Sequence, residues 1–309
     1  MLVTLFGEAL IDELESGRDV PGGAPLNVAC HLRAFGLEPL VVSRLGDDVD
    51  GERLRAEAVR RGLDVRGMQT DRDRPTGRVI VHQEPDGPRF EIPEEQAWDF
   101  IDSEAAVRAV AGGAPGLFYF GTLAGRHGVS RSALVKLLGL GWKTCLLDLN
   151  LRPPWFDARA VERSLASADV VKATEEELRL AAGLLRVGGS APGPATTLMK
   201  RFSLDRVVIT RGPNGAFTVE ESGLGAETAG MPLGGELVDT VGAGDAFSAV
   251  LILGLLRGWD SATVLPRADA FARAVCCIPG AVPGDDAFYQ PFLQAWDLDG
   301  QETSESSVL

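Results

Sequence analysis

Short apolar runs alternate along this chain with longer stretches in which apolar residues recur every three or four positions. The short runs predict buried strands, and the amphipathic stretches predict helices. The predicted strands are Leu2–Phe6, Leu40–Arg44, Leu117–Phe120, Thr144–Leu149, Asp169–Val171 and Arg206–Thr210. The predicted helices are Asn27–Phe35, Gly51–Arg61, Ser130–Leu140, Glu175–Leu184, Ala246–Arg257 and Leu265–Cys277. Strands that alternate with helices predict an α/β fold with a mainly parallel sheet between two helical layers.

The segment Thr76–Pro93 departs from this alternation. It consists of two extended runs joined by a Pro-Asp-Gly turn, which is typical of a β-hairpin. No helix follows either run to bury its second face, so we expect a small sheet that projects from the main domain as a lid. Gly188–Pro194 predicts a flexible loop, and Gly300–Leu309 predicts a disordered tail.

Composition and charge restrict the classes of function. With 309 residues and 45% hydrophobic content, the chain can bury the core of one large α/β domain or of two smaller ones. A net charge of −14 argues against nucleic acid as a partner. No apolar run is long enough for a membrane span, and the amino-terminal residues carry acids rather than the basic region of a signal peptide.

The cysteine and histidine residues restrict the classes of function further. The four cysteines form no CxxC pair and lie mostly among apolar neighbours, which favours buried thiols in a cytoplasmic protein. Three histidines without an HExxH motif argue against a zinc site.

The strongest chemical signal is the turn Gly242-Ala243-Gly244, which precedes Asp245 and the apolar helix Ala246–Arg257. The first amides of a helix lack intrahelical acceptors and carry partial positive charge. Small residues let an anion approach these amides, so the turn suits a phosphate and Asp245 suits a general base beside it. Taken alone, the turn is explained equally well by a tight bend with Asp245 as the helix N-cap.

Other nucleotide-binding motifs are absent from the sequence. No glycine is followed by lysine, so there is no Walker GK[ST] element. No GxG triplet extends to GxGxxG, which sets aside a Rossmann dehydrogenase.

A second glycine pair, Gly22-Gly23, opens the helix that carries Asn27. The pair permits close approach to the backbone, and the Asn27 amide can both donate to and accept from a polyol. By itself, this motif is equally consistent with a loop before a capped helix.

Together these two motifs resemble the signatures of the ribokinase-like (PfkB-type) carbohydrate kinases. Gly22–Gly36 is similar to the amino-terminal signature of that family, and Val238–Leu251 is similar to its carboxy-terminal signature DTxGAGDxF. The resemblance covers residues 1–295 and implies one three-layer α/β/α sandwich with a mainly parallel central sheet. It also implies a β lid formed mainly by residues 12–21 and 76–97, and a flexible tail over residues 296–309.

Within that family the sequence looks most like the fructokinases. GEALID at residues 7–12 is similar to the fructokinase opening, and DLNLRPPWF at residues 148–156 resembles the DxNxRxxxW element. Ala97-Trp98-Asp99 after the predicted lid is also typical of that branch. The substrate-binding residues implied by the resemblance are Asp12, Gly22, Gly23, Asn27 and Arg152. Three roles for Arg152 stay open: contact with substrate, contact with phosphate, or pairing with an acid such as Asp148.

The resemblance also implies ATP across the carboxyl edge of the sheet. Glu177 would hold Mg²⁺ through water, and Asp239 would hold a monovalent cation such as K⁺ together with backbone carbonyls near Val241 and Val275. The implied nucleotide-binding residues are Lys172, Thr174, Thr210, Gly212, Gly215 and Gly280.

Two positions depart from the family pattern. The magnesium-associated NxxE motif has threonine at Thr174 in place of asparagine, and a hydroxyl group can still hold a metal-bound water. Glu175–Glu177 also suits an acidic first turn of a helix. Cys276–Pro279 precedes Gly280 where relatives often carry threonine and basic residues, which puts the cation loop and the adenine edge in question.

These signals predict a cytoplasmic, ATP-dependent sugar kinase similar to fructokinases, with Asp245 as general base and residues 242–244 as anion hole. A 2-keto-3-deoxygluconate kinase, or another sugar or nucleoside kinase of the family, is the alternative, since Arg152, Arg78 or Arg89 could meet a substrate carboxylate. A catalytically silent sensor is the alternative from another class, although the base and the small residues are intact. Neither nucleic acid nor membrane is expected as a partner, and an exposed apolar lid face would favour a homodimer.

Overall fold

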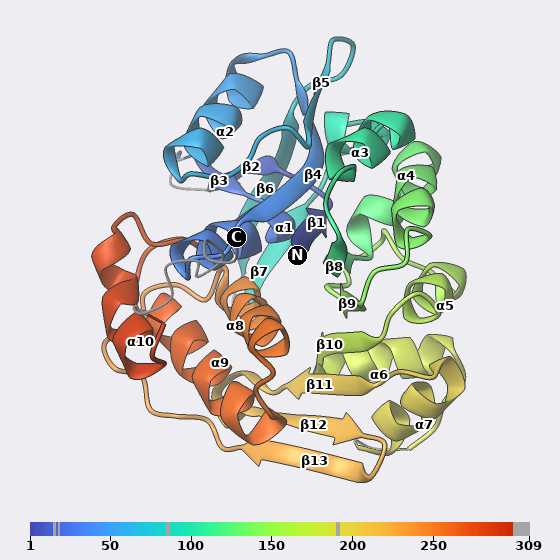
Figure 1. Cartoon of the computed structure of the whole chain (residues 1–309), viewed down its shortest axis with the longest axis vertical. Helices are drawn as coiled ribbons and strands as arrows, with labels where there is room; N and C mark the ends of the chain where they lie inside the picture. Colours follow the sequence, from blue (N-terminus) through green and yellow to red (C-terminus); the bar gives the residue numbers. More distant parts are fainter. Residues whose placement is uncertain (15–16, 18, 85–86, 190–191, 299–309) are drawn as a thin grey trace, which may run out of the picture.

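The computed structural model describes the chain except for residues 15–16, 18, 85–86, 190–191 and 299–309 (Figure 1). The described residues form a nine-stranded sheet and a separate four-stranded sheet. None of the helices in the described ranges combines the length and the apolar character needed to span a bilayer.

The larger sheet has the strand order β13-β12-β11-β10-β9-β8-β1-β4-β5. Strands β5 to β11 in this order pair in parallel, and β12 and β13 are added antiparallel at one edge. From β1 the chain enters β4 on one side and later β8 on the other, so the order reverses at β1, and such a switch point opens a crevice at the carboxyl ends of the strands. The strands are β1 (Leu2–Phe6), β4 (Pro39–Gly46), β5 (Met68–Asp71), β8 (Pro115–Gly121), β9 (Thr144–Asp148), β10 (Val170–Thr174), β11 (Arg206–Thr210), β12 (Ala216–Glu220) and β13 (Gly223–Thr228).

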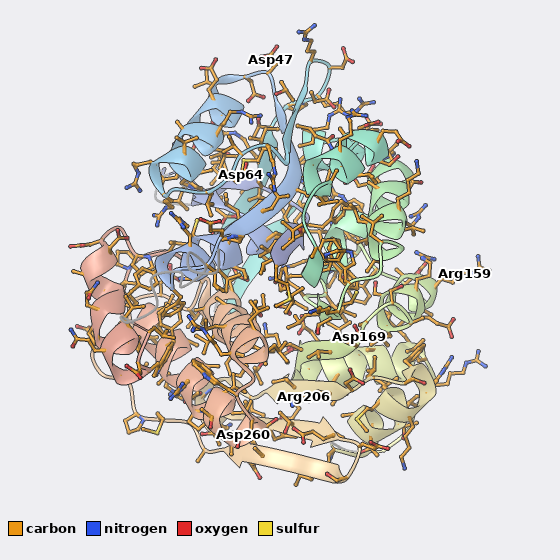
Figure 2. All side chains as sticks on the ribbon, in the orientation of Figure 1. Asp47, Asp64, Arg159, Asp169, Arg206 and Asp260 are labelled. Atoms are coloured by element: carbon orange, nitrogen blue, oxygen red, sulfur yellow. The ribbon has the colours of Figure 1, made fainter. Side chains whose placement is uncertain are left out.

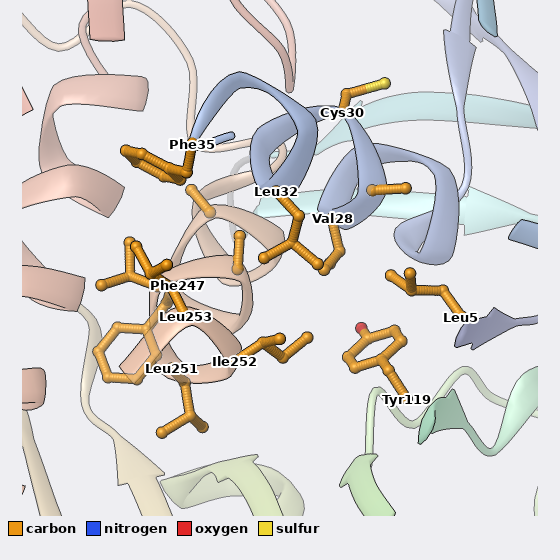
Figure 3. Close-up of a cluster of buried hydrophobic side chains, with 14 of the residues drawn as sticks. Leu5, Val28, Cys30, Leu32, Phe35, Tyr119, Phe247, Leu251, Ile252 and Leu253 are labelled. Carbon is orange, nitrogen blue, oxygen red and sulfur yellow. The ribbon is translucent and has the colours of Figure 1, made fainter. Parts of the chain in front are cut away.

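Helices cover both faces of this sheet, and each face has its own apolar core (Figure 1). Figure 3 shows Val28 and Leu32 of α1 directed toward α8, where Phe247 and Ile252 lie. One layer contains α1 (Ala24–Ala34), α2 (Val49–Arg60), α8 (Ala243–Arg257), α9 (Ser261–Val275) and α10 (Gln290–Ala295). The other contains α3 (Ser103–Val110), α4 (Gly128–Leu138), α5 (Ala158–Leu165), α6 (Glu175–Leu184) and α7 (Gly193–Phe202).

The smaller sheet, here called the lid sheet, has the order β3-β2-β6-β7. Residues 7–9 connect the end of β1 to its first strand, so the lid sheet grows directly out of a strand of the main sheet. A third apolar cluster packs the lid sheet against two short 3₁₀ segments, residues 97–100 and 123–125, and consists of Leu10, Val79, Ile92, Trp98 and Leu123. The strands of the lid sheet are β2 (Leu10–Leu14), β3 (Asp19–Gly22), β6 (Gly77–Glu84) and β7 (Gly87–Glu91).

Two groups of helix starts differ in what covers their first amides. Aspartate side chains accept hydrogen bonds from first-turn amides of α2, α3, α5 and α9, and the last of these caps, Asp260, is labelled beside α9 in Figure 2. Helices α1 and α8 instead begin at Gly23 (φ 102°) and Gly242 (φ 81°), without a side-chain cap. No cap side chain therefore covers the first amides of α1 and α8, and both of these helices begin at the crevice.

The predicted fold class is confirmed: a mainly parallel sheet lies between two helical layers, and a small separate sheet fits a lid. Helix α9 begins at Ser261, earlier than predicted, because Asp260 caps it. Helix α7 begins at Gly193, inside the segment predicted as a loop. The predicted hairpin tip at residues 85–86 and the tail from residue 299 lie outside the described residues. Trp296, which was assigned to the tail, is buried and packs on Phe35 with ring centroids 5.4 Å apart.

Candidate active site

The carboxyl ends of β1, β8, β9 and β10 meet the starts of α1 and α8 around one cavity of about 300 Å³. This is the place where the strand order predicts a ligand crevice. The structure therefore brings together the predicted base, the small-residue turn, most of the predicted sugar-binding residues and part of the predicted nucleotide set. The polar lining residues are Glu8, Asp12, Asn27, Asp148, Asn150, Arg152, Lys172, Thr174, Glu177, Thr240 and Asp245.

Asp245 stands in the first turn of α8, three residues after the N-cap Gly242, so it is not the cap of that helix. Its Oδ2 accepts a hydrogen bond of 2.8 Å from Nδ2 of Asn27 on α1. Burial raises the pKa of Asp245 to about 6; the Asn27 hydrogen bond opposes this rise, and the charge of Asp148 adds to it. Such a carboxyl group is ionised at neutral pH and is a stronger base than an ordinary aspartate.

The residues Gly242–Gly244, here called the phosphate turn, bring the amino end of α8 to the cavity. A Cβ atom at Gly242 would lie 2.4 Å from Cα of Ala281, so the backbone of the turn rests directly against that residue. The amide of Ala243 already donates to the carbonyl of Thr240 at 3.3 Å. The turn therefore has the small residues and the uncapped start that anion binding requires.

A buried polar network, here called the rear network, lies behind the phosphate turn and consists of Lys172, Asp148, Ser248 and Tyr119. Nζ of Lys172 donates to both carboxylate oxygens of Asp148, at 2.9 and 3.2 Å, and to the carbonyl of Gly244 at 3.2 Å. Asp148 also accepts from the hydroxyl groups of Ser248 at 2.8 Å and Tyr119 at 3.2 Å. Burial opposes the charged form of Lys172, but the nearby acids outweigh it, so its pKa lies above the ordinary value. The ammonium group therefore stays charged beside the turn.

Asp12 lies on β2 of the lid sheet, and its carboxylate occupies space that Gly22 leaves open. A Cβ atom at Gly22 would lie 2.0 Å from Oδ2 of Asp12. At Gly23, where φ is 102°, a Cβ atom would lie 2.4 Å from the carbonyl oxygen of Glu8. Burial raises the pKa of Asp12 to about 7, and the charge of Asp245 adds to the rise. The glycine pair thus shapes one wall of the cavity around an acid.

Glu8 is a functional candidate that the sequence analysis missed. Its side chain is 6% exposed and lines the cavity. Burial raises its pKa to about 7; hydrogen bonds from backbone amides, including that of Ala24, oppose the rise, and the charge of Asp245 adds to it. An acid two residues after the apolar strand β1, inside the GEALID motif, is the sequence signal that could have identified it.

The lid sheet supplies much of the apolar wall of the cavity, through Leu10, Val79 and the nearby Ile92. Trp98 packs in the same apolar cluster, and the guanidinium group of Arg126 lies 4.2 Å from the centre of its ring. Arg126 also pairs with buried Asp99 at 2.7 Å. The segment Ala97-Trp98-Asp99 therefore supports the base of the lid sheet.

Arg152 lines the cavity just beyond the carboxyl end of β9. Its positive charge lowers the pKa of three carboxyl groups, those of Glu8, Asp12 and Asp245. The three roles left open for Arg152 stay predictions, and its place in the cavity fits each of them.

Arg78, by contrast, pairs with acids outside the cavity lining. It forms ion pairs with Asp50 at 2.7 Å, Asp19 at 3.1 Å and Glu13 at 3.3 Å, which tie the lid sheet to α2. The side chain of Arg89 lies outside the described part of the chain. Among the described arginines considered for a substrate carboxylate, Arg152 is the one at the cavity.

Thr174 and Glu177 form a capping box at the start of α6, and both line the cavity. Oγ1 of Thr174 accepts from the amide of Glu177 at 3.1 Å, and the Glu177 carboxylate accepts from the amides of Thr174 and Leu151, each at 2.8 Å. This cap accounts for part of the acidic first turn at Glu175–Glu177. The Glu177 carboxylate at the cavity also fits Mg²⁺, which keeps several waters and binds through one or two carboxylates together with substrate phosphates.

The predicted phosphate loop begins at the carboxyl end of β11, one strand beyond β10. Thr210 is the register partner of Thr174 across these two strands. Gly212 and Gly215 follow with φ of 53° and 83°, and a Cβ atom at Gly215 would lie 2.1 Å from the carbonyl oxygen of Thr228. The structure thus places this loop at the same sheet edge as the cavity.

Asp239 ties the segment before α8 to the segment after α9. It accepts hydrogen bonds from the amides of Val241 at 3.0 Å and Gly280 at 3.3 Å, and these three residues line an adjoining cavity of about 190 Å³. The carbonyl of Val275 accepts from the amide of Ile278 at 3.1 Å. Over the described ranges, no group of three or more His, Cys, Asp or Glu side chains is arranged to hold a metal ion.

The family comparison agrees with this geometry. The model of the pfkB family carbohydrate kinases matches residues 4–286 of the chain. The chain therefore belongs to the pfkB family of carbohydrate kinases and is an ATP-dependent sugar kinase, as the resemblance of its two signatures implies.

Individual relatives span most of the chain. A fructokinase from Klebsiella pneumoniae is 29% identical over 268 residues, which cover 82% of this chain and 84% of the relative. An uncharacterized sugar kinase from Pyrococcus horikoshii, solved in complex with ATP, is 25% identical with a TM-score of 0.75 and covers 94% of this chain and 97% of that chain. The structure of a 2-dehydro-3-deoxygluconokinase from Thermotoga maritima, 20% identical, has a TM-score of 0.78 with 95% and 98% coverage. The same fold thus occurs in kinases of different sugars.

Proposed function

We propose that this sugar kinase transfers the γ-phosphoryl group of ATP to a primary hydroxyl group of fructose. The observation that carries the proposal is the Asp245 carboxylate, held 2.8 Å from the Asn27 amide at the uncapped start of α8. The Klebsiella fructokinase, similar over most of the chain, supports the choice of sugar.

The charges around the cavity favour a neutral polyol over a sugar acid. Five acids line it, and Arg152 is placed to balance the charge of three of them, Glu8, Asp12 and Asp245. The carboxylate of 2-keto-3-deoxygluconate would add negative charge to this cluster and would compete with the acids for Arg152. A ketose brings only neutral groups, for which Asp12 and Asn27 supply an acceptor and a donor.

In the proposed mechanism Asp245 takes the proton of the attacking hydroxyl group while the new O–P bond forms. The bond from the γ-phosphorus to its bridging oxygen breaks, and ADP leaves with the electron pair of that bond. The amides of the phosphate turn and the ammonium group of Lys172 stabilise the negative charge of the transferring group. The lid sheet covers the sugar and keeps water from competing for the phosphoryl group.

In this proposal Glu177 and Thr174 hold a hydrated Mg²⁺ ion, which neutralises phosphate charge when it is bound. Asp239 and the carbonyls near Val241 and Val275 hold a monovalent cation, and the loop around Gly212 holds phosphate oxygens. The cytoplasmic location and a homodimer through the lid sheet stay predictions.

A coupled assay with ATP and Mg²⁺ tests the proposal on fructose, 2-keto-3-deoxygluconate, ribose and adenosine, each with and without K⁺. We expect saturable turnover on fructose, with kcat/KM at least about tenfold above that of the keto acid. Preference for the keto acid would overturn the proposed sugar while keeping the role of Asp245. The Asp245→Asn variant, purified in parallel, shows whether a contaminating kinase contributes to the signal.

A further inference from the structure

His31 is a buried histidine that the proposed reaction does not use. It lies four residues after Asn27 on α1 and has no exposed surface. Its Nδ1 is 2.9 Å from the hydroxyl oxygen of Tyr289, and its Nε2 is 3.1 Å from the carbonyl oxygen of Ala281. The ring also stands edge-on to Phe271, with ring centroids 5.1 Å apart. Both ring nitrogens therefore have a partner far away in the sequence.

These partners define where the imidazole proton lies. The carbonyl of Ala281 can only accept, so Nε2 of His31 carries the hydrogen and donates it. Nδ1 is then an acceptor and receives the hydroxyl hydrogen of Tyr289. Burial lowers the pKa of His31 to about 3, against the effect of the carbonyl bond, so the ring is neutral at pH 7. The side chain thus acts as a fixed bridge between two segments.

The segment that His31 holds is the support of the phosphate turn. Cα of Ala281 lies where a Cβ atom on Gly242 would approach within 2.4 Å, so the two backbones are in direct contact. The preceding residue, Gly280, donates its amide to Asp239 at 3.3 Å. A shift of residues 279–282 would therefore move the surface against which the phosphate turn is packed.

We propose that His31 is a positioning residue for phosphoryl transfer, because its hydrogen bond to Ala281 fixes the backbone that supports Gly242. The inference rests on the proposed role of the phosphate turn. Asn27 and His31 share one face of α1, since residues four apart on a helix are neighbours. A single rigid helix therefore orients the base Asp245 through Asn27 and the phosphate turn through His31.

The kinetic test compares three variants of the full chain on the best sugar substrate of the wild type. His31→Leu removes the donor, and we expect kcat to fall about tenfold or more while the KM for sugar changes less than about threefold. His31→Gln keeps an N–H group that can reach the Ala281 carbonyl and should restore kcat to within about threefold of wild type. Phe292→Leu loosens the same aromatic cluster without touching His31 and should leave kcat within about twofold.

Amide hydrogen exchange gives a readout that does not need turnover. In His31→Leu, residues 239–244 and 279–282 should exchange at least about tenfold faster than in Phe292→Leu, while the strands of the main sheet stay protected. Equal exchange in the two variants, or a raised KM with unchanged kcat, or a His31→Gln variant as slow as His31→Leu, would overturn the inference. If the wild type phosphorylates none of the tested sugars, the proposed substrate fails, and the exchange comparison still decides whether His31 positions the turn.

Discussion

The cavity has two sides whose charged groups differ in their partners. The phosphate side consists of the phosphate turn and the rear network, and the sugar side contains Glu8 and Asp12. On the phosphate side, the Lys172–Asp148 pair is closed by further hydrogen bonds inside the rear network, so the fold itself satisfies its polar groups. On the sugar side, Glu8 and Asp12 are acids whose burial raises the pKa of each to about 7. The fold thus prepares the phosphate side in advance, whereas the sugar side keeps acceptors whose desolvation a substrate with hydroxyl groups can offset.

Breaking the Lys172–Asp148 ion pair on the phosphate side should have the largest effect, and that effect is on stability. Lys172→Met leaves Asp148 as a buried charge without its cation, so the free energy of unfolding should fall by about 3–5 kcal/mol. Urea denaturation at pH 7 measures this change. Lys136→Met removes only the exposed pair with Glu104 and should change the same quantity by less than about 0.5 kcal/mol. Equal losses in the two variants would show that the rear network adds no stability.

Removing the proposed base should stop chemistry while the phosphate side keeps its shape. Asp245→Asn should lower kcat by about 10²-fold or more, because the amide cannot take the hydroxyl proton. Calorimetry should find the dissociation constant for ATP changed less than about threefold, since the turn and Lys172 are unaltered. The matched control is Asp260→Asn, which keeps a capping side chain on α9 and should have wild-type kcat. Wild-type turnover of Asp245→Asn would exclude Asp245 as the base.

On the sugar side, a single methyl group should be enough to displace the Asp12 carboxylate. In Gly22→Ala the new Cβ would lie 2.0 Å from Oδ2 of Asp12, so the carboxylate must move. We expect the KM for sugar to rise about tenfold, the effect of losing one or two hydrogen bonds, while kcat stays within about threefold. Gly183→Ala on α6, where a Cβ meets no atom within 4 Å, should leave both constants unchanged in the same assay. A KM unaffected by Gly22→Ala would remove Asp12 from sugar binding.

The smallest expected effect is the loss of stability caused by burying the Glu8 carboxylate. The pKa of Glu8 is raised in the folded protein, so its contribution to stability is full below about pH 4.5 and is lost as pH rises through about 7. Glu8→Gln should therefore stabilise the protein by about 1 kcal/mol at pH 8 and change little at pH 5. Thermal unfolding at the two pH values measures this, with the exposed Glu38→Gln as the variant that should shift at neither. A Glu8→Gln variant that is less stable than the wild type at pH 8 would show that burial of the ionised Glu8 carboxylate does not lower the stability of the protein.

The phosphate side was the part of the site that the sequence could predict. The signal for Gly242–Asp245 is local, because small residues and an acid at the start of one helix suffice to describe an anion site. The six predicted strands and the six predicted helices are long enough, or apolar enough, to be predicted from periodicity alone. Helices α3 and α5 were missed because eight residues give too few repeats of an apolar face, and α7 was missed because it begins in the glycine- and proline-rich segment Gly188–Pro194.

The remaining features of the site depend on contacts between segments that are distant in the sequence. The pairing of Lys172 with Asp148 is set by the register of β10 on β9, which no local pattern specifies. Glu8 lies just beyond the predicted strand Leu2–Phe6, and its importance comes from a cavity built by other elements. The hydrogen bond from His31 to Ala281 joins residues 250 apart, so only the folded chain reveals it.

The hydrogen bond between Asn27 and Asp245 also has a consequence for synthesis. The two residues are 218 positions apart, and at about 5–20 residues per second a ribosome needs roughly 10–40 s to make the chain between them. During that interval α1 has no α8 to cover Val28 and Leu32, so the nascent chain exposes an apolar helix face that chaperones recognise. A chain released before residue 245 would carry the sugar side of the cavity without a base, and the cell would hold an aggregation-prone fragment rather than a slow kinase.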